Sequence, residues 1–288
     1  MTSTINQKRL LAVHDISCFG RCSLTVALPI ISSIGVETVV LPTAILSTHT
    51  GGFKGFTYRD LTGDLNKILQ HWDTLNLEFD AIYSGFLGSF EQIDIVSEMF
   101  KKLRRAQSII AVDPVMADNG KLYTIFDNSF PKGMTKLCSM ADIIMPNITE
   151  AAFMLDISYK EGPYTKEYIK NLLIKLSDMG PSRVVLTGVY FNEGELGAAA
   201  YDATTGVISY EMSPKIPGYY HGTGDVFGSA LVAAVVRGIE LSKAIKIAVD
   251  FTVGSIMRTY KAETDIRFGV NFEEGLGDFI KDCNNKLK

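Results

Sequence analysis

Hydrophobic and polar positions along this chain form blocks that predict strands and helices in turn. Short, mainly apolar runs predict buried strands at residues 10–13, 38–41, 81–83, 108–112, 143–145 and 183–187. Longer mixed stretches predict helices at residues 23–34, 61–72, 92–105, 150–155, 166–179, 225–238, 241–260 and 272–285. Apolar strands that alternate with helices are typical of a mostly parallel sheet with helices on both faces. The pattern therefore predicts an α/β fold, a three-layer α/β/α sandwich.

Two further strand-like runs, residues 196–201 and 206–210, flank a turn-forming stretch and predict a β-hairpin. The chain has 288 residues, enough for one large α/β domain or two small ones. Because no Pro/Gly/Ser-rich linker and no internal repeat interrupts the alternation, we expect a single domain over residues 1–288.

The composition of the chain indicates which kinds of partner it does not bind. The net charge is −4, from 28 basic and 32 acidic side chains, which gives no electrostatic footprint for nucleic acid. No apolar run approaches the roughly 20 residues of a membrane span. Residues 1–9 are polar and lack the apolar core of a signal peptide. We therefore expect a cytoplasmic protein that binds neither nucleic acid nor membrane.

The four cysteines show no metal-ligand or disulfide spacing. His14, Cys18 and Cys22 stand four residues apart, but Gly20 lies between the cysteines and no fourth ligand is near. A zinc site is therefore disfavoured, and small buried side chains with one loop thiol are expected instead.

Polar residues collect where the predicted strands end. They are His14, Asp15, Thr48, His49, Thr50, Ser84, Gly85, Asp113, Asp118, Asn147, Glu150 and Thr187. Ligands of open α/β sheets bind in the crevice outside the carboxyl ends of the strands. We therefore expect these residues to form one site.

The most informative stretch is Gly222-Thr223-Gly224-Asp225, which precedes an apolar helical run. Such a turn directs backbone N–H groups at an anion such as phosphate. Asp225 would repel that anion unless it accepts the proton of a hydroxyl that attacks phosphorus. The alternative is an ordinary aspartate at a helix start after a glycine turn. No Walker A sequence and no Gly-x-Gly-x-x-Gly follows a strand, which excludes the P-loop and Rossmann patterns.

Asn147 and Glu150, in Pro146-Asn147-Ile148-Thr149-Glu150, could offer oxygens to a hydrated Mg²⁺ beside phosphates. The alternative is a helix start with an acidic first turn. Asp113 and Asp118 could bind cation-linked phosphate or a monovalent ion, or could simply form an Asp-Pro turn.

The loop 47–52 is rich in hydroxyl groups and glycine. It could close over a small polar ligand, or it could be an ordinary solvated turn. His14 and Asp15 could hydrogen-bond a heterocycle or a hydroxyl, although such a pair is often structural.

From about residue 10 to residue 259 the chain resembles the ribokinase-like superfamily and, within it, the pyridoxal (vitamin B6) kinases. The resemblance rests on five motifs in order: Ser47-Thr48-His49-Thr50-Gly51, Ser84-Gly85-Phe86-Leu87-Gly88-Ser89, Asp113-Pro114-Val115-Met116, the stretch 141–150, and Gly222-Thr223-Gly224-Asp225. It implies a ribokinase-like fold and ATP-dependent phosphorylation of the 5′-hydroxymethyl group of pyridoxal, pyridoxamine or pyridoxine.

The resemblance also assigns roles by position. Asp225 is implied as the catalytic base, and Gly222, Thr223 and Gly224 as the anion hole. Asn147 and Glu150 are implied to bind Mg²⁺ with the phosphates of ATP. Asp113, Asp118 and Thr187 are implied to contact ATP, with a monovalent cation such as K⁺ nearby. Asp15, Thr50 and Phe86 are implied to contact the ring of the substrate. A homodimer is implied as well.

Two positions depart from the B6-kinase pattern. Asp15 stands where these kinases usually carry a serine that touches the ring, and Phe86 where they often carry a tyrosine. Asp15 is also reminiscent of hydroxymethylpyrimidine kinases, which share the fold and the ring-CH₂OH chemistry. That activity is therefore the main alternative. A second alternative is a sugar or nucleoside kinase of the same superfamily, but such kinases commonly carry a lid hairpin after the first strand, and residues 15–23 are too short to form one. A third alternative is a sensor that binds B6 without turnover.

Overall fold

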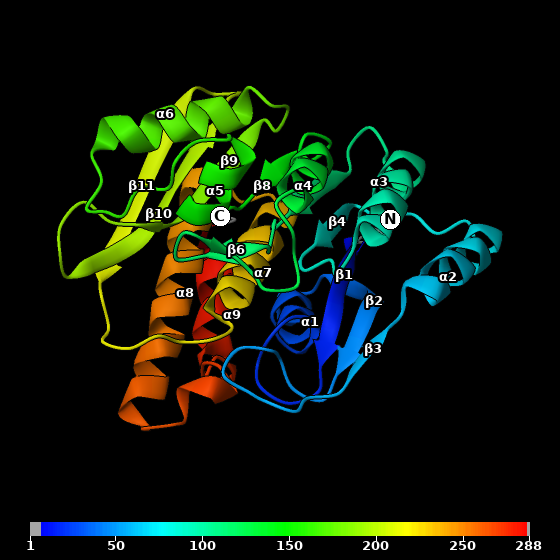
Figure 1. Ribbon diagram of the computed structural model, residues 1–288, viewed down its shortest axis with the longest axis horizontal. Coiled ribbons are helices and arrows are strands. Elements are labelled where there is room, and N and C mark those ends of the chain that lie inside the picture. Colours follow the sequence, from blue (N-terminus) through cyan, green and yellow to red (C-terminus); the bar gives the residue numbers. More distant parts are fainter. Residues whose placement is uncertain (1–6, 287–288) are drawn as a thin grey trace, which may run out of the picture.

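A nine-stranded sheet runs through the middle of the molecule in the computed structural model, which describes residues 7–286 (Figure 1). Its strand order is β11-β10-β9-β8-β5-β4-β1-β2-β3. The strands from β9 to β2 in this order are parallel: β9 Arg183–Val189, β8 Ile143–Ile144, β5 Ile109–Val112, β4 Ala81–Ser84, β1 Arg9–Ser17 and β2 Glu37–Leu46. The predicted mostly parallel sheet is confirmed. The first six residues of the polar N-terminal segment lie outside the described residues.

Antiparallel strands complete both edges of the sheet. β10 (Glu195–Asp202) and β11 (Val207–Pro214) form the predicted hairpin. At the other edge β3 (Tyr58–Asp60) pairs with β2. A separate two-stranded sheet joins β6 (Ala117–Asp118) and β7 (Lys121–Leu122). The three short strands β3, β6 and β7 were not predicted, because two or three residues are too few to show a period in the sequence.

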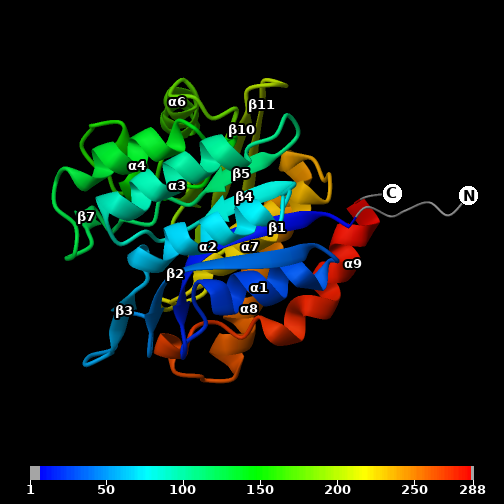
Figure 2. The ribbon, with the colours of Figure 1, turned by 90° about the vertical axis from the view of Figure 1, so that its right-hand side faces the viewer.

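One face of the sheet is covered by the first helix and the last three. They are α1 Leu24–Ser33, α7 Thr223–Val236, α8 Leu241–Lys261 and α9 Leu276–Lys286 (Figure 2). Leu10, Ala12 and Tyr83 point into this layer and are buried. In the described part of the chain, no helix has the length and hydrophobicity needed to cross a membrane.

The opposite face is covered by the five helices between them. They are α2 Thr62–Thr74, α3 Phe90–Leu103, α4 Phe130–Cys138, α5 Ile148–Met154 and α6 Lys166–Ser177 (Figures 1 and 2). Leu11, Val13 and Ile82 point into this second layer. Because neighbouring residues of a strand face opposite sides, fully apolar strands fill both layers at once. The predicted α/β/α sandwich is confirmed.

Helix α4 is one element that the sequence pattern did not reveal. Pro131 and Gly133 suggest a turn in the sequence. In the structure Pro131 lies in the first helical turn, where its missing N–H costs nothing. Met134 and Leu137 are buried against the sheet. The helix therefore forms because of its apolar face rather than its local propensity.

Strand β1 is longer than predicted. The apolar run ends at Val13, so His14 and Asp15 were expected in a loop. The strand instead continues to Ser17, because Ile16 and Ser17 pair with β2 after a register shift. This corrects the predicted position of His14 and Asp15: both are buried within the strand.

Candidate active site

The turn before α7 has the geometry that its glycines predict. Gly222 is the N-cap of α7 and adopts φ +76° and ψ +1°, a left-handed conformation. A Cβ atom there would lie 2.0 Å from the carbonyl oxygen of Arg21. Only glycine therefore allows this backbone to pack against the loop 18–23. Thr223 and Gly224 begin the helix, so their N–H groups belong to its unpaired, positively polarised end.

Asp225 lies in the first turn of α7, partly exposed. Burial raises the pKa of its carboxyl to about 7; the backbone N–H dipole of Ser23 lowers the pKa, and the charge of Asp15 raises it. A carboxylate with a pKa near neutrality can accept a proton and remains ionised in a large fraction of molecules. Asp225 is therefore suited to act as a base.

Asp113 feels the charges of two other carboxyls of this region, Glu150 and Asp225. Asp113 follows β5, and Glu150 lies in the first turn of α5 after β8, so the parallel strands bring both to one edge. The pKa of Asp113 is raised strongly by burial and then by the charges of Glu150 and Asp225. None of these shifts is offset by a Lys or Arg in the described residues. Mutually repelling carboxylates of this kind favour a bound cation.

Asn147 and Glu150 form a capping box at the start of α5. The Asn147 Oδ1 atom accepts the Glu150 N–H at 2.9 Å, and the Glu150 Oε2 atom accepts the Asn147 N–H at 2.9 Å. Glu150 Oε1 also accepts the Met116 N–H at 3.1 Å, and Asn147 Nδ2 donates to the Ala117 carbonyl at 2.8 Å. The capping box expected of an ordinary helix start is thus present, and its hydrogen bonds fix the positions of both side chains.

This geometry decides how the pair could hold Mg²⁺. Both Glu150 oxygens already accept backbone N–H groups, and burial raises the pKa of the side chain to about 8. Within the described residues, no three His, Cys, Asp or Glu side chains form a ready metal cluster. Mg²⁺ normally keeps several waters and one or two carboxylates. The pair therefore fits a hydrated Mg²⁺ held through its waters beside phosphate oxygens.

Asp118 and Thr187 lie beside this capping box. Thr187 in β9 forms a parallel bridge with Asn147, and its N–H donates to the Pro146 carbonyl at 3.1 Å. Asp118 in β6 accepts the Tyr219 hydroxyl at 2.8 Å. Because Tyr219 lies in the stretch before Gly222, this bond joins the predicted ATP side to the anion turn.

The residues expected near a ring lie in three segments. Thr50 is exposed in the loop after β2, and its neighbour Gly51 packs against His221, with a Cβ position 2.5 Å from His221 Nδ1. Phe86 follows β4 and packs against Phe126, with ring centroids 5.9 Å apart. The loop of Thr50 therefore reaches the anion turn.

Asp15 is buried, and both of its carboxylate oxygens accept hydroxyls of the same chain. Oδ1 accepts the Ser23 hydroxyl at 2.6 Å, and Oδ2 accepts the Ser17 hydroxyl at 3.1 Å. The charge of Asp15 acts on both Asp225 and His49, so Asp15 lies within electrostatic reach of the anion turn and of the loop 47–52. A direct contact of Asp15 with a ring stays a prediction.

Three further residues of the site carried no signal that the sequence analysis used. Ser23 donates its hydroxyl to Asp15 Oδ1 at 2.6 Å, although the sequence shows it only as a residue at a helix start. Tyr83 is fully buried and faces Asp113 and Asp225. Tyr219 bonds Asp118 across about a hundred residues of sequence. Only the tertiary fold brings these side chains to the site.

Comparison with known proteins places the chain among small-molecule kinases. The family model described as phosphomethylpyrimidine kinase matches residues 28–268. Pyridoxal kinase of Dictyostelium discoideum is 24% identical, over 90% of this chain and 89% of that protein. Hydroxymethylpyrimidine/phosphomethylpyrimidine kinase of Aquifex aeolicus is 28% identical, over 66% of this chain and 75% of that protein.

Solved structures agree with this placement. A candidate phosphomethylpyrimidine kinase of Bacteroides thetaiotaomicron, crystallised with pyridoxal, is 41% identical, with a TM-score of 0.91 over 95% of this chain and 96% of that chain. Pyridoxal kinase of Lactobacillus plantarum is 29% identical, with a TM-score of 0.88 over 95% of this chain and 97% of that chain. The expected ribokinase-like fold and the resemblance to the B6 kinases are confirmed.

Proposed function

Because this chain belongs to the phosphomethylpyrimidine kinase family, we propose that it uses ATP to phosphorylate the 5′-hydroxymethyl group of pyridoxal, pyridoxamine or pyridoxine. The observation that carries the proposal is Asp225, with a pKa of about 7, in the first turn of α7 directly after a glycine-framed anion turn. Pyridoxal in the Bacteroides structure supports the substrate class. By family analogy we also propose a cytoplasmic homodimer.

In this proposal the residues of the site act mainly by alignment. The N–H groups of Thr223 and Gly224 would face the γ-phosphoryl group, and Asp225 would accept the proton of the attacking hydroxyl. Asp113, Asp118 and Thr187 would line the ATP side. Phosphoryl transfer has a loose transition state, so the proton moves late and charge neutralisation matters most.

Asn147 and Glu150 would hold hydrated Mg²⁺ next to the phosphates, and the ion would neutralise charge that develops on them. Asp113, whose pKa is raised by burial and by two neighbouring carboxylates, would gain from the same positive charge. A monovalent cation such as K⁺ could serve the Asp113 and Asp118 side in the same way. In this proposal Asp113 and Glu150 serve a bound cation, and the Asn147–Glu150 pair does more than cap helix α5.

Glu150→Gln should raise the Mg²⁺ concentration needed for half-maximal turnover. The amide lacks the charge, and its NH₂ group would meet a backbone N–H where the carboxylate accepts one. The measurement is a magnesium titration at saturating ATP, with the exposed Glu161→Gln as the matched control. An identical titration curve for Glu150→Gln and wild type would remove Glu150 from the metal site.

The main alternative is a hydroxymethylpyrimidine kinase, which the family description and the Aquifex relative favour. The two activities differ only in the ring that carries the CH₂OH group. We expect ATP consumption to be faster with at least one of pyridoxal, pyridoxamine or pyridoxine than with hydroxymethylpyrimidine. Turnover with the pyrimidine alone would overturn the B6 assignment and leave the catalytic machinery as proposed.

A further inference from the structure

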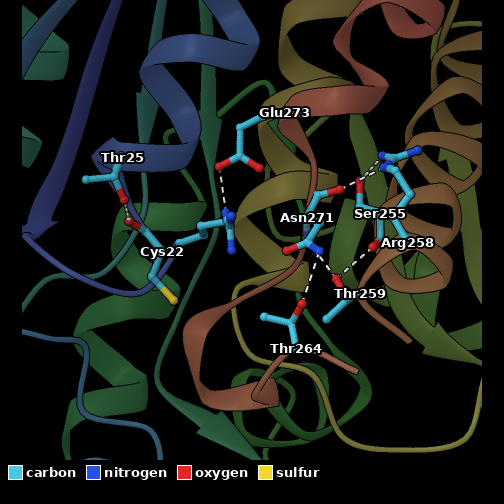
Figure 3. A network of polar contacts seen from close by, with 9 residues as sticks. Cys22, Thr25, Ser255, Arg258, Thr259, Thr264, Asn271 and Glu273 are labelled. Atoms are coloured by element: carbon cyan, nitrogen blue, oxygen red, sulfur yellow. Dashed lines mark hydrogen bonds and ion pairs between the residues drawn. The ribbon is translucent and has the colours of Figure 1, made fainter. Parts of the chain in front are cut away.

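The segment between α8 and α9, residues 265–273, holds the loop 18–23. The Arg21 N–H donates to the Phe268 carbonyl at 3.1 Å, and the Arg21 Nε atom lies 2.6 Å from Glu273 Oε1. Figure 3 shows Glu273 near the Cys22–Thr25 pair at the start of α1. The loop that packs against the anion turn is therefore also fixed from the C-terminal part of the chain.

The α8–α9 segment is itself held at both ends. Asn271 donates its N–H to the Thr259 hydroxyl at 2.7 Å and accepts from Arg258 Nε at 2.8 Å (Figure 3). At the other end Asp265 accepts the Arg267 N–H at 2.9 Å and the Arg267 Nη2 group at 2.6 Å. These bonds give the segment a defined shape, including its 3₁₀ turn Ile266–Phe268.

The same turn holds the loop 47–52 through His49. The Gly51 N–H donates to His49 Nδ1 at 3.1 Å, so Nδ1 carries no proton and His49 Nε2 carries one. Nε2 lies 2.6 Å from the Arg267 carbonyl oxygen, to which it donates. His49 is buried, and both of its ring nitrogens are used by bonds within the protein. Its imidazole therefore joins the loop of Thr50 to the α8–α9 segment.

The His49 ring also lies against the loop 18–23 and the stretch before the anion turn. A Cβ atom at Gly20 would lie 2.5 Å from His49 Cδ2, so the ring packs directly on the backbone of Gly20. The His49 and His221 rings have centroids 5.1 Å apart. One imidazole thus contacts three segments that surround Thr50.

Three aromatic rings, one from each segment, form a cluster beside His49. Phe268 of the α8–α9 segment lies 4.9 Å from Phe19 and 6.4 Å from Phe53, measured between ring centroids. Phe53, directly after the loop 47–52, also lies under the Arg267 guanidinium, 5.6 Å from its ring centroid. Contacts of this kind stabilise the arrangement of the segments that supply the rings. Phe268 is the ring that the α8–α9 segment contributes to the cluster.

We propose that Phe268 and His49 are positioning residues for the substrate: through them the α8–α9 segment holds the loops 18–23 and 47–52 together, so that Thr50 stays beside the anion turn. The inference rests on the proposed function, because it takes Thr50 as a contact of the substrate ring. It adds to that function a role for residues more than two hundred positions away from Thr50 in the sequence.

The contacts of the α8–α9 segment predict which substrate is affected. The loops 18–23 and 47–52 follow β1 and β2, whereas Asp113, Asn147 and Thr187 follow or lie in β5, β8 and β9. Among residues 7–286, no hydrogen bond or ion pair joins residues 265–273 to these three ATP-side residues. Loosening the segment should therefore weaken the use of the ring substrate and leave the use of ATP nearly unchanged.

The first test compares substitutions at Phe268. Phe268→Ala removes the ring that contacts Phe19 and Phe53 and leaves the main-chain carbonyl, so KM for pyridoxal should rise at least about fivefold. KM for ATP should stay within about twofold of the wild type. Phe268→Tyr keeps the ring and should restore KM for pyridoxal. Ile266→Ala, at an exposed position of the same turn, is the matched control. An equal rise in both KM values, or no rise in either, would overturn the inference.

The second test separates the two bonds of His49. A glutamine can place an N–H near the position of Nε2 and keep the donor for Arg267, whereas an asparagine can place its oxygen near Nδ1 and keep only the acceptor for Gly51. KM for pyridoxal should therefore be at least about threefold higher in His49→Asn than in His49→Gln. Equal KM values for the two variants would show that the bond to Arg267 does not position the loop.

Amide hydrogen exchange of the unliganded full chain measures the same link without turnover. Peptides that cover residues 47–57 should exchange at least about threefold faster in Phe268→Ala and in His49→Asn than in the wild type. Peptides that cover β5 should exchange as in the wild type, which shows that the variants are folded.

The failure of the inference and that of the proposed function have different signatures. Unchanged exchange of residues 47–57 in both variants would overturn the inference even in an active kinase. A wild-type chain that phosphorylates no B6 vitamer, with faster exchange of this loop in both variants, would overturn the proposed function and leave the link between the α8–α9 segment and the loop 47–52 standing.

Discussion

Asp225→Asn is expected to reduce turnover at least about 100-fold, within the range that a general base contributes. The amide cannot accept the proton of the attacking hydroxyl, while its size and position in the first turn of α7 stay the same. The measurement is kcat for ATP-dependent phosphorylation at saturating pyridoxal and Mg²⁺, beside a thermal melt that shows the variant is folded.

Asp250→Asn is the matched control for this change. Asp250 is an exposed aspartate of α8, and among residues 7–286 it bonds only to Lys246 on the same helix. Its loss should therefore leave turnover within about twofold. Turnover of Asp225→Asn near that of the control would contradict the assignment of Asp225 as the base.

The same residue predicts the pH profile of the wild type. The pKa of Asp225 is raised to about 7. Below that pH the carboxyl is protonated and cannot act as a base, so kcat/KM should fall as pH decreases through about 7 and level off above it. A profile without an acidic limb between about pH 6 and 8 would argue against a raised pKa.

Gly222→Ala is expected to have the second largest effect. An alanine at φ +76° costs about 1–3 kcal/mol of strain. Its Cβ would also lie 2.0 Å from the Arg21 carbonyl oxygen, which forces the anion turn away from the loop 18–23. We expect a lower melting temperature and a fall in turnover of about tenfold or more, because the N–H groups of the turn would no longer point at the phosphoryl group.

Gly224→Ala provides the comparison for stability. No heavy atom lies within 4 Å of a Cβ at Gly224, and its backbone has no positive φ. Its melting temperature should therefore stay near that of the wild type. Equal melting temperatures for the two variants would mean that the close approach at Gly222 is unimportant.

Much of the fold was predictable because its strands are unusually apolar. Ala81–Ser84 and Ile109–Val112 are almost entirely buried, and a short apolar run between two helices is typical of an interior strand of a parallel sheet. The polar end of β1 was not predictable. His14 and Asp15 continue a strand only because β2 offers partners beyond a register shift, which is a tertiary fact.

The candidate site was partly predictable for the same reason. Asp113 and Asn147 follow parallel strands, so their convergence is a consequence of topology. The hydrogen bond of Ser23 to Asp15 could not be found in this way. It depends on a backbone angle and on a hydroxyl turned toward Asp15, and a serine before a helix usually serves as a cap.

The most direct test of the proposed function is identification of the product. Wild-type protein is incubated with Mg²⁺, ATP and pyridoxal, and the reaction is followed by ³¹P NMR. The account predicts that the γ-phosphate signal is replaced by that of a phosphomonoester on the 5′ oxygen of pyridoxal, and that Asp225→Asn forms almost none in the same time. ATP that stays intact, or is hydrolysed to free phosphate with no ester on pyridoxal, would contradict it.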